Sequence, residues 1–197
     1  MSAPTPAIGT LPARAVDDII ADIMKAEFSL DAEHCLLGNM RYKIPPDQKL
    51  FVVVFDDMGP PFGACTFLDI DETSPTYGLE VQQSTVLHTV RVETMGFIDD
   101  DGYDVAKDTA PKVTHALGGF LAQQAMGKYR LQIGRAQAPI NATDTEETAR
   151  LVKYVSRVNI TALHQTAKAP PAGADYFDKF NGATVNGSAN APEVITQ

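Results

Sequence analysis

The chain has 197 residues, with 16 Lys or Arg against 25 Asp or Glu and a formal net charge of -9. This charge argues against nucleic-acid binding, whose affinity comes largely from Lys and Arg that displace counterions from phosphates. No apolar stretch approaches the roughly 20 residues that a membrane-spanning helix needs, and residues 1–12 lack the pattern of a signal peptide. We therefore expect a soluble protein that is not exported and that has a sizeable core.

The first half of the chain predicts a helix followed by strands. Apolar residues recur at helical spacing over 13–28, which indicates an amphipathic helix. The run 49–55 (KLFVVVF) predicts a strand covered on both faces. The segment 56–63 (DDMGPPFG) contains two Gly and two Pro, which is typical of a turn, so we expect a turn there and a second strand over 64–70.

An alternating segment over 79–95 predicts a further strand after a polar loop at 71–78. Successive side chains of a strand point to opposite faces. The set that we expect to face the core comprises Val86, His88, Val90, Val92 and Thr94.

A second helix is predicted after the aspartate-rich turn that ends this strand. Pro111 is tolerated only in the first turn of a helix, so we expect Asp108 or Thr109 to cap it. The pair Gly118–Gly119 would then lie inside the helix and permit close packing.

A short strand over 131–136 and a longer one over 151–163 complete the predicted body. The fold class is therefore α+β, with a mixed or mainly antiparallel β-sheet packed against two α-helices. We expect an N-terminal arm over 1–12, one domain over 13–165 and an extended C-terminal tail over 166–197 that orders only on contact.

The residues that could carry chemistry do not form a recognisable catalytic or metal-binding pattern. Asp99, Asp100 and Asp101 precede Gly102 and Asp104, but adjacent carboxylates diverge and no Glu follows at the spacing of a calcium loop. We read this segment as a solvated turn. We expect no catalytic residue, no cofactor and no metal site.

Cysteine and histidine spacing supports the same expectation. Cys35 and Cys65 lack a CxxC spacing and are expected to be buried thiols. His34 lies beside Cys35 and near Asp31, yet adjacent residues seldom face one another, so a nucleophile pair is not predicted. The four histidines show no metal-ligand spacing; they are His34, His88, His115 and His164.

Taken in order, these segments resemble the neck or tail terminator proteins of tailed bacteriophages. The similarity covers roughly residues 13–165 and includes the N-terminal helix, the VVV strand, the strand QQSTVLHTVRVETMGF, a helix with Ala and Leu on its buried face, and a late strand of the form Arg-x-Asn-Ile-Thr-Ala. The Asp-rich turn and the Pro/Ala/Asn-rich tail have no place in the family pattern.

This resemblance implies a structural virion protein rather than an enzyme. Six copies would form a ring in the phage neck that caps the tail tube, stops its polymerisation and joins the head-completion connector. The implied partners are further copies of the chain, the connector, the tail tube and possible sheath proteins, while DNA passes through without specific binding. Assembly would take place in the host cytoplasm.

Two sets of residues are candidate functional surfaces under this interpretation. Carboxylates could line the lumen and repel DNA phosphates; they are Asp56, Asp57, Asp99, Asp100 and Asp101, with the acidic segment 69–72 beside them. The tail could dock on a neighbouring protein through Tyr176, Phe177 and Phe180.

Other functions remain open at this stage. The chain could be a connector, a stopper or a tail-tube subunit, which ring size and co-assembly would distinguish. It could be a small metal-dependent enzyme that uses the turn 99–104, which predicts binding of a divalent metal. It could also be a cellular α+β binding domain.

Overall fold

The chain divides into two compact units in a computed structural model. The described residues are 10–11, 14–38, 47, 49–74, 77–98, 100–143 and 151–168. The larger unit comprises 10–64 and 83–165, and the described part of the smaller unit lies within 65–82 and 166–168.

Three helices and seven strands occur within the described residues. The helices are α1 (Val16–Phe28), α2 (Val105–Ala116) and α3 (Phe120–Tyr129). The strands are β1 (Thr10–Leu11), β2 (Cys35–Leu37), β3 (Phe51–Leu68), β4 (Glu80–Phe97), β5 (Leu131–Ile133), β6 (Ile140–Asn141) and β7 (Leu151–Lys168). The predicted α+β class is confirmed, with three helices in place of the two expected.

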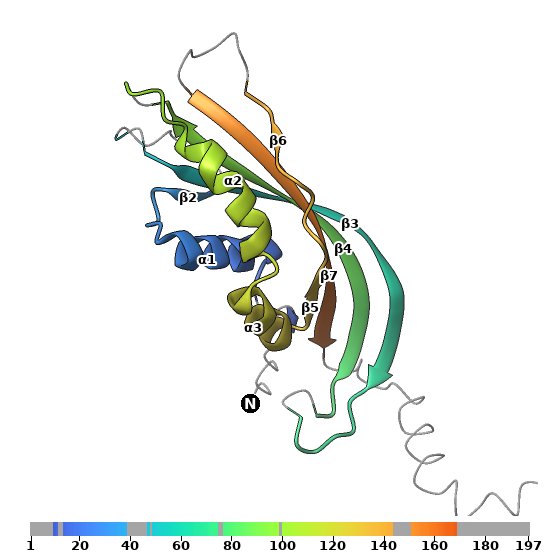
Figure 1. Cartoon of the computed structure of the whole chain (residues 1–197). Helices are drawn as coiled ribbons and strands as arrows, with labels where there is room; N and C mark the ends of the chain where they lie inside the picture. Colours follow the sequence, from blue (N-terminus) through green and yellow to red (C-terminus); the bar gives the residue numbers. More distant parts are fainter. Residues whose placement is uncertain are drawn as a thin grey trace, which may run out of the picture. The chain divides into compact units, whose positions relative to one another are not determined.

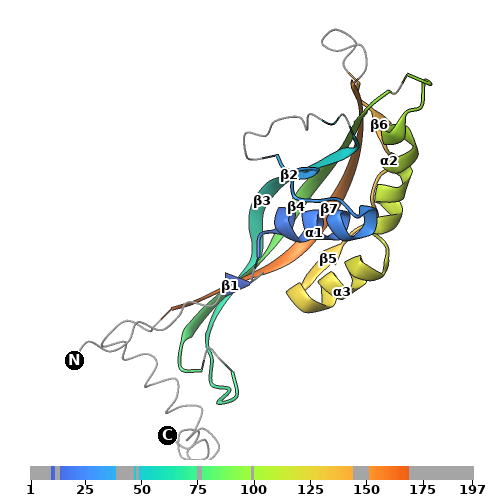
Figure 2. The same cartoon turned by 90° about the vertical axis from the view of Figure 1, so that its left-hand side faces the viewer.

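The strands form one mixed sheet in the order β1-β7-β4-β3-β2, and β5 and β6 also pair with β7. β2 runs parallel to β3, whereas β5 and β6 run antiparallel to β7. The three helices lie on the same side of the sheet in both views, and α1 crosses in front of the strands when that side faces the viewer (Figures 1 and 2). The opposite face of the larger unit's sheet carries none of these helices.

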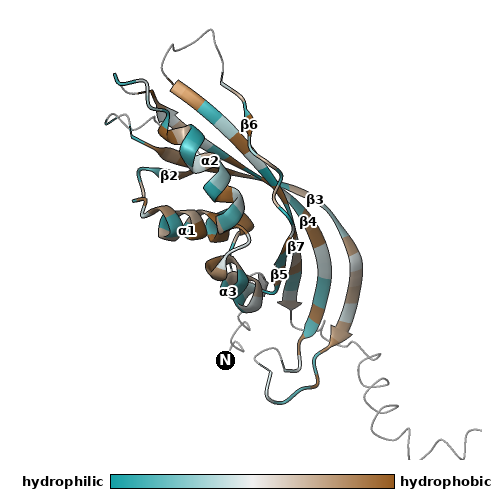
Figure 3. Cartoon of the chain, viewed as in Figure 1, coloured by the Kyte–Doolittle hydropathy of each residue, from teal (hydrophilic) through white to brown (hydrophobic). Residues whose placement is uncertain are grey.

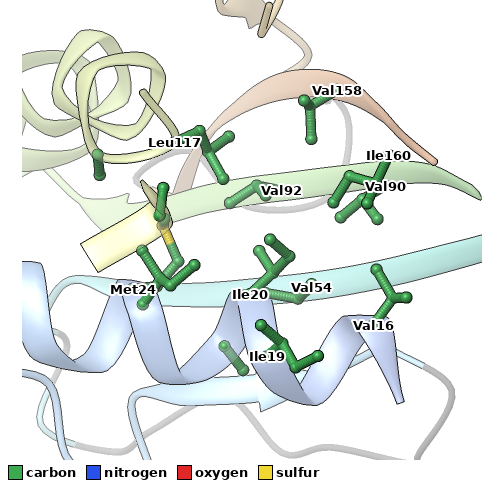
Figure 4. Packing of buried hydrophobic residues seen from close by; sticks show 14 of the residues in the cluster. Val16, Ile19, Ile20, Met24, Val54, Val90, Val92, Leu117, Val158 and Ile160 are labelled. Carbon is green, nitrogen blue, oxygen red and sulfur yellow. The ribbon is translucent and has the colours of Figure 1, made fainter. Parts of the chain in front are cut away.

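The main core lies between the helices and the sheet. One face of α1 packs against four side chains of the sheet that are 0% exposed (Figure 4). They are Val54 of β3, Val90 and Val92 of β4, and Ile160 of β7. Burying each such side chain contributes roughly 1.5–3 kcal/mol relative to leaving it in water. The inward set predicted for β4 is buried, from Val86 to Thr94, and alternating polar and apolar bands along the strands are visible in Figure 3.

The turn expected at 56–63 is wrong, because β3 continues as one strand from Phe51 to Leu68. Gly59 is needed there, since a Cβ would lie 2.8 Å from the carbonyl oxygen of Leu87. Gly63 has φ +59, a left-handed conformation that glycine adopts without strain. The register with β2 ends at Val54, so this later part of β3 is an edge among the described residues, where proline is tolerated.

The real turn of this hairpin lies in the smaller unit. The amide of Asp69 donates to the carbonyl of Leu79 at 2.9 Å, and the amide of Gly78 donates to the carbonyl of Asp69 at 2.8 Å. The polar, Pro-containing loop predicted over 71–78 therefore connects β3 directly to β4.

The predicted start of the second helix is also wrong. α2 begins at Val105, and its cap is Asp104, whose side chain accepts a hydrogen bond from the amide of Lys107 at 2.9 Å. Pro111 consequently lies inside α2 rather than in its first turn. Because proline has no N–H group, α2 lacks one backbone hydrogen bond at this position. The Asp104 cap and the buried apolar face of the helix offset this loss. The pair Gly118–Gly119 separates α2 from α3 instead of lying within one helix.

Candidate interaction surfaces

The candidate lumen residues occupy different environments. Asp57 is exposed on β3, and Asp100 and Asp101 are exposed in the turn before α2. Asp56, by contrast, has a side chain that is only 14% exposed and is engaged by His88. Asp99 and the tail aromatics Tyr176, Phe177 and Phe180 lie outside the described residues.

Asp56 is the first member of a polar row across three neighbouring strands of the larger unit. His88 Nδ1 lies 2.8 Å from Asp56 Oδ2, and His88 Nε2 lies 3.0 Å from His164 Nε2. The two imidazole rings are nearly coplanar at 13°, with centroids 5.3 Å apart. Because the nitrogen separation is much shorter than the centroid separation, the rings meet edge to edge through one N–H···N hydrogen bond.

The polar row requires a defined number of protons. A carboxylate oxygen of Asp56 accepts the hydrogen bond from His88 Nδ1, and only one proton fits between the two Nε2 atoms. Burial lowers the pKa of His164, and the nearby His88 lowers it further. The hydrogen bonds of the row join β3, β4 and β7 at fixed register.

The members of the polar row lie on the side of the sheet that carries the main core. Asp56 comes two residues after Val54 on β3, and His164 comes two residues after Ala162 on β7. Because residues two apart share a face of a strand, both continue the core-facing set of their strand. Asp17 at the start of α1 is 6% exposed, and burial raises its pKa. The described residues contain no group of three or more His, Cys, Asp or Glu that could hold a metal ion.

Large apolar side chains are exposed on the β3–β4 ribbon. In the larger unit Met58 is 67% exposed, Phe62 53% and Leu87 41%. In the smaller unit the exposed ones are Phe67, Ile70 and Tyr77. Alternation places Met58 and Phe62 on the face of β3 that also carries Val54, whereas Leu87 lies on the opposite face of the sheet. Single exposed apolar residues are ordinary, but two neighbouring ones on one face of a strand form a candidate contact surface.

A basic pocket lies on the sheet between β4, β6 and β7. Arg91 and Glu93 of β4 line it together with Lys153 and Arg157 of β7 and Ile140 of β6. Sequence analysis missed this pocket, although alternation on β4 and β7 places these charges on one face of each strand. What the sequence does not reveal is that β4 and β7 are neighbours in the sheet.

The cysteines and His34 do not form a nucleophilic pair. Cys35 is buried as expected, its thiol donates to the carbonyl of Ala21 at 3.4 Å, and burial raises its pKa to about 11. Cys65 is exposed, which corrects the expectation that both thiols are buried. His34 instead contacts Asp31 at 2.7 Å and Asp47 at 3.0 Å.

Comparison with known proteins gives no family for this chain. The chain matches no protein-family model and no curated protein. None of the helices in the described ranges is long and apolar enough to cross a membrane.

Proposed function

We propose that this chain is a structural virion protein, a tail terminator of the phage neck. Copies of the chain close into a ring, six in number, that caps the tail tube and stops its polymerisation. The ring joins the tail to the head-completion connector and lets DNA pass. The resemblance of the sequence to such proteins motivates the proposal.

The observation that carries the proposal is the pair of exposed apolar side chains on the later part of β3. Met58 and Phe62 are 67% and 53% exposed within the larger unit. A ring needs a heterologous contact, in which one patch on a subunit meets a different patch on the next. Each side chain covered in such a contact would contribute roughly 1.5–3 kcal/mol if burial were complete.

The ribbon favours docking through side chains over simple strand addition. Pro60 and Pro61 lack backbone N–H groups, which removes two donors from this stretch of β3. A neighbouring strand could not form an unbroken ladder there. We therefore assign the contact to the apolar side chains that flank the two prolines.

The acidic lumen is retained in the proposal with a reduced set of residues. Asp57, Asp100 and Asp101 are exposed and could repel DNA phosphates electrostatically. Asp56 is removed from this set because its carboxylate pairs with His88.

The test is the mass of the purified full chain, alone and after mixing with growing tail tubes of the same virion. Sedimentation and electron microscopy should show a ring of six, or a monomer that becomes a ring on tube ends and stops tube growth. A chain that polymerises into tubes by itself would be a tube subunit. A monomer or dimer that ignores tubes would overturn the proposal.

A further inference from the structure

The basic pocket is an exception on a chain with a net charge of -9. Among the described residues, three cations line it, Arg91, Lys153 and Arg157, together with one carboxylate, that of Glu93. Glu93 lies 3.2 Å from Arg91 Nε and 3.8 Å from Lys153 Nζ, so it is shared by these two. Arg157 forms no ion pair with another described residue, so the described lining carries more positive than negative charge.

Arg91 of the basic pocket is held in place before anything binds. The guanidinium carbon of Arg91 lies 4.2 Å from the centre of the Phe55 ring, a cation–π contact that orients it. Glu93 has a side chain only 8% exposed and cannot leave its two partners cheaply. A preformed charged site lowers the ordering cost of binding an anion.

The size of the basic pocket selects the kind of occupant. Its volume is about 250 Å³, below the roughly 300–1,000 Å³ typical of small-molecule and cofactor sites. The volume suits one or two amino-acid side chains. Ile140, which is 61% exposed, adds an apolar rim, so the best occupant carries carboxylates beside an apolar residue.

A segment of this same sequence has that chemistry. Ile70, Asp71 and Glu72 are exposed in the smaller unit, and Ile70 is 59% exposed. The loop that presents them is internally braced: Asp71 Oδ1 accepts from the amide of Thr73 at 2.9 Å, and Asp69 Oδ1 accepts from the amide of Asp71 at 3.0 Å. The segment can therefore bind with little further ordering.

We propose that the basic pocket of one copy receives the Ile70–Glu72 segment of a second copy of this chain. Arg157 and Lys153 would pair with the carboxylates, and Ile140 would pack against Ile70. The pocket and the segment are different patches, as a head-to-tail ring requires. This inference rests on the proposed ring and names a second contact between neighbouring copies, beside the apolar contact of β3.

The experiment uses charge reversal in the full chain. Arg157→Glu and Glu72→Arg alter exposed side chains, so each should keep the wild-type unfolding midpoint while weakening self-association roughly tenfold or more. Mixing the two variants in equal amounts should restore the ring, because wild-type contacts alternate with reversed but complementary ones. Lys112→Glu on α2 makes the same change of charge as a control and should leave the ring intact.

Each alternative result overturns the inference in a recognisable way. If Arg157→Glu forms rings as well as the wild type, the basic pocket is not the contact, while the proposed function stands. If only the double variant in one chain recovers and mixing does not, the contact lies within one copy. If a short DNA duplex binds to the wild type and not to Arg157→Glu with the ring unchanged, the basic pocket takes phosphate. A wild type that never self-associates overturns the proposed ring together with this contact.

Discussion

The two parts of β3 on either side of Asp56 differ in how far their side chains are buried. Residues Phe51 to Val54 are 0% exposed and pack on both faces, with β2 as a parallel neighbour. Beyond Asp56, Met58 and Phe62 are 67% and 53% exposed on the same strand. Apolar residues in the first part are required by the fold, whereas those in the second part are not, which is why we assign them to assembly.

The largest expected effect tests the buried part. Phe51→Ala should lower the free energy of unfolding by about 3–5 kcal/mol, because a fully buried aromatic side chain leaves a cavity. Denaturant unfolding followed by circular dichroism measures the change. A loss below about 1 kcal/mol would mean that this part of β3 is not the tightly packed region described here.

The polar row lies at the boundary between the two parts. His88→Ala should cost about 1–3 kcal/mol, because it leaves the carboxylate of Asp56 without its partner in a poorly hydrated position. His115→Ala, at an exposed position on α2, is the matched control and should change stability little. Equal effects from the two variants would show that the row does not tie the strands.

A smaller effect tests whether the second part of β3 is an ordered strand. Gly63→Ala should destabilise the chain by about 1 kcal/mol, because Gly63 has φ +59 and an L-residue is strained there although space is open. Gly127→Ala, in α3 with open space, should stabilise it by up to about 1 kcal/mol. If Gly63→Ala were neutral, the backbone conformation that replaces the expected turn would be wrong.

The pH dependence of stability sharpens the role of the polar row. The pKa of His164 is lowered, so between this value and the ordinary value of about 6.5 the unfolded chain binds more protons, and stability falls as pH falls through this window. His164→Asn should remove that fall.

His34 makes stability depend on pH in the opposite direction. Its pKa is raised mainly by the hydrogen bond of its ring to Asp31 and, to a lesser extent, by that to Asp47. Its contribution to stability is therefore complete below a pH of about 6.5 and is lost as the pH rises through the raised pKa. His34→Asn should therefore flatten the alkaline side of the window. Identical pH profiles for the two variants would contradict the opposite environments assigned to these histidines.

The limits of sequence reasoning are clearest along β3 and β4. Periodicity predicted that Val86 to Thr94 face the core, because alternation depends only on the local strand geometry. Composition wrongly predicted a turn at 56–63, because the two glycines there have other roles within a strand. Gly59 allows the backbone to approach Leu87 closely, and Gly63 adopts a left-handed conformation. Tertiary pairing outweighed the local turn preference.

The candidate surfaces were less predictable than the fold. Asp56 was singled out by its charge, but its pairing with His88 and His164 joins residues distant in sequence. The basic pocket likewise depends on the sheet order that places β7 beside β4. No spacing rule within a single strand reports which strands become neighbours.

The most direct test of the central claim combines stability and mass for Phe62→Asp, measured beside the wild type. The wild type should sediment as a ring, or close into one on tube ends. Phe62→Asp should shift towards the monomer while its free energy of unfolding stays within about 0.5 kcal/mol of the wild type, because the side chain is exposed. A variant that assembles normally, or that loses stability like Phe51→Ala, would contradict the assignment of the second part of β3 to assembly.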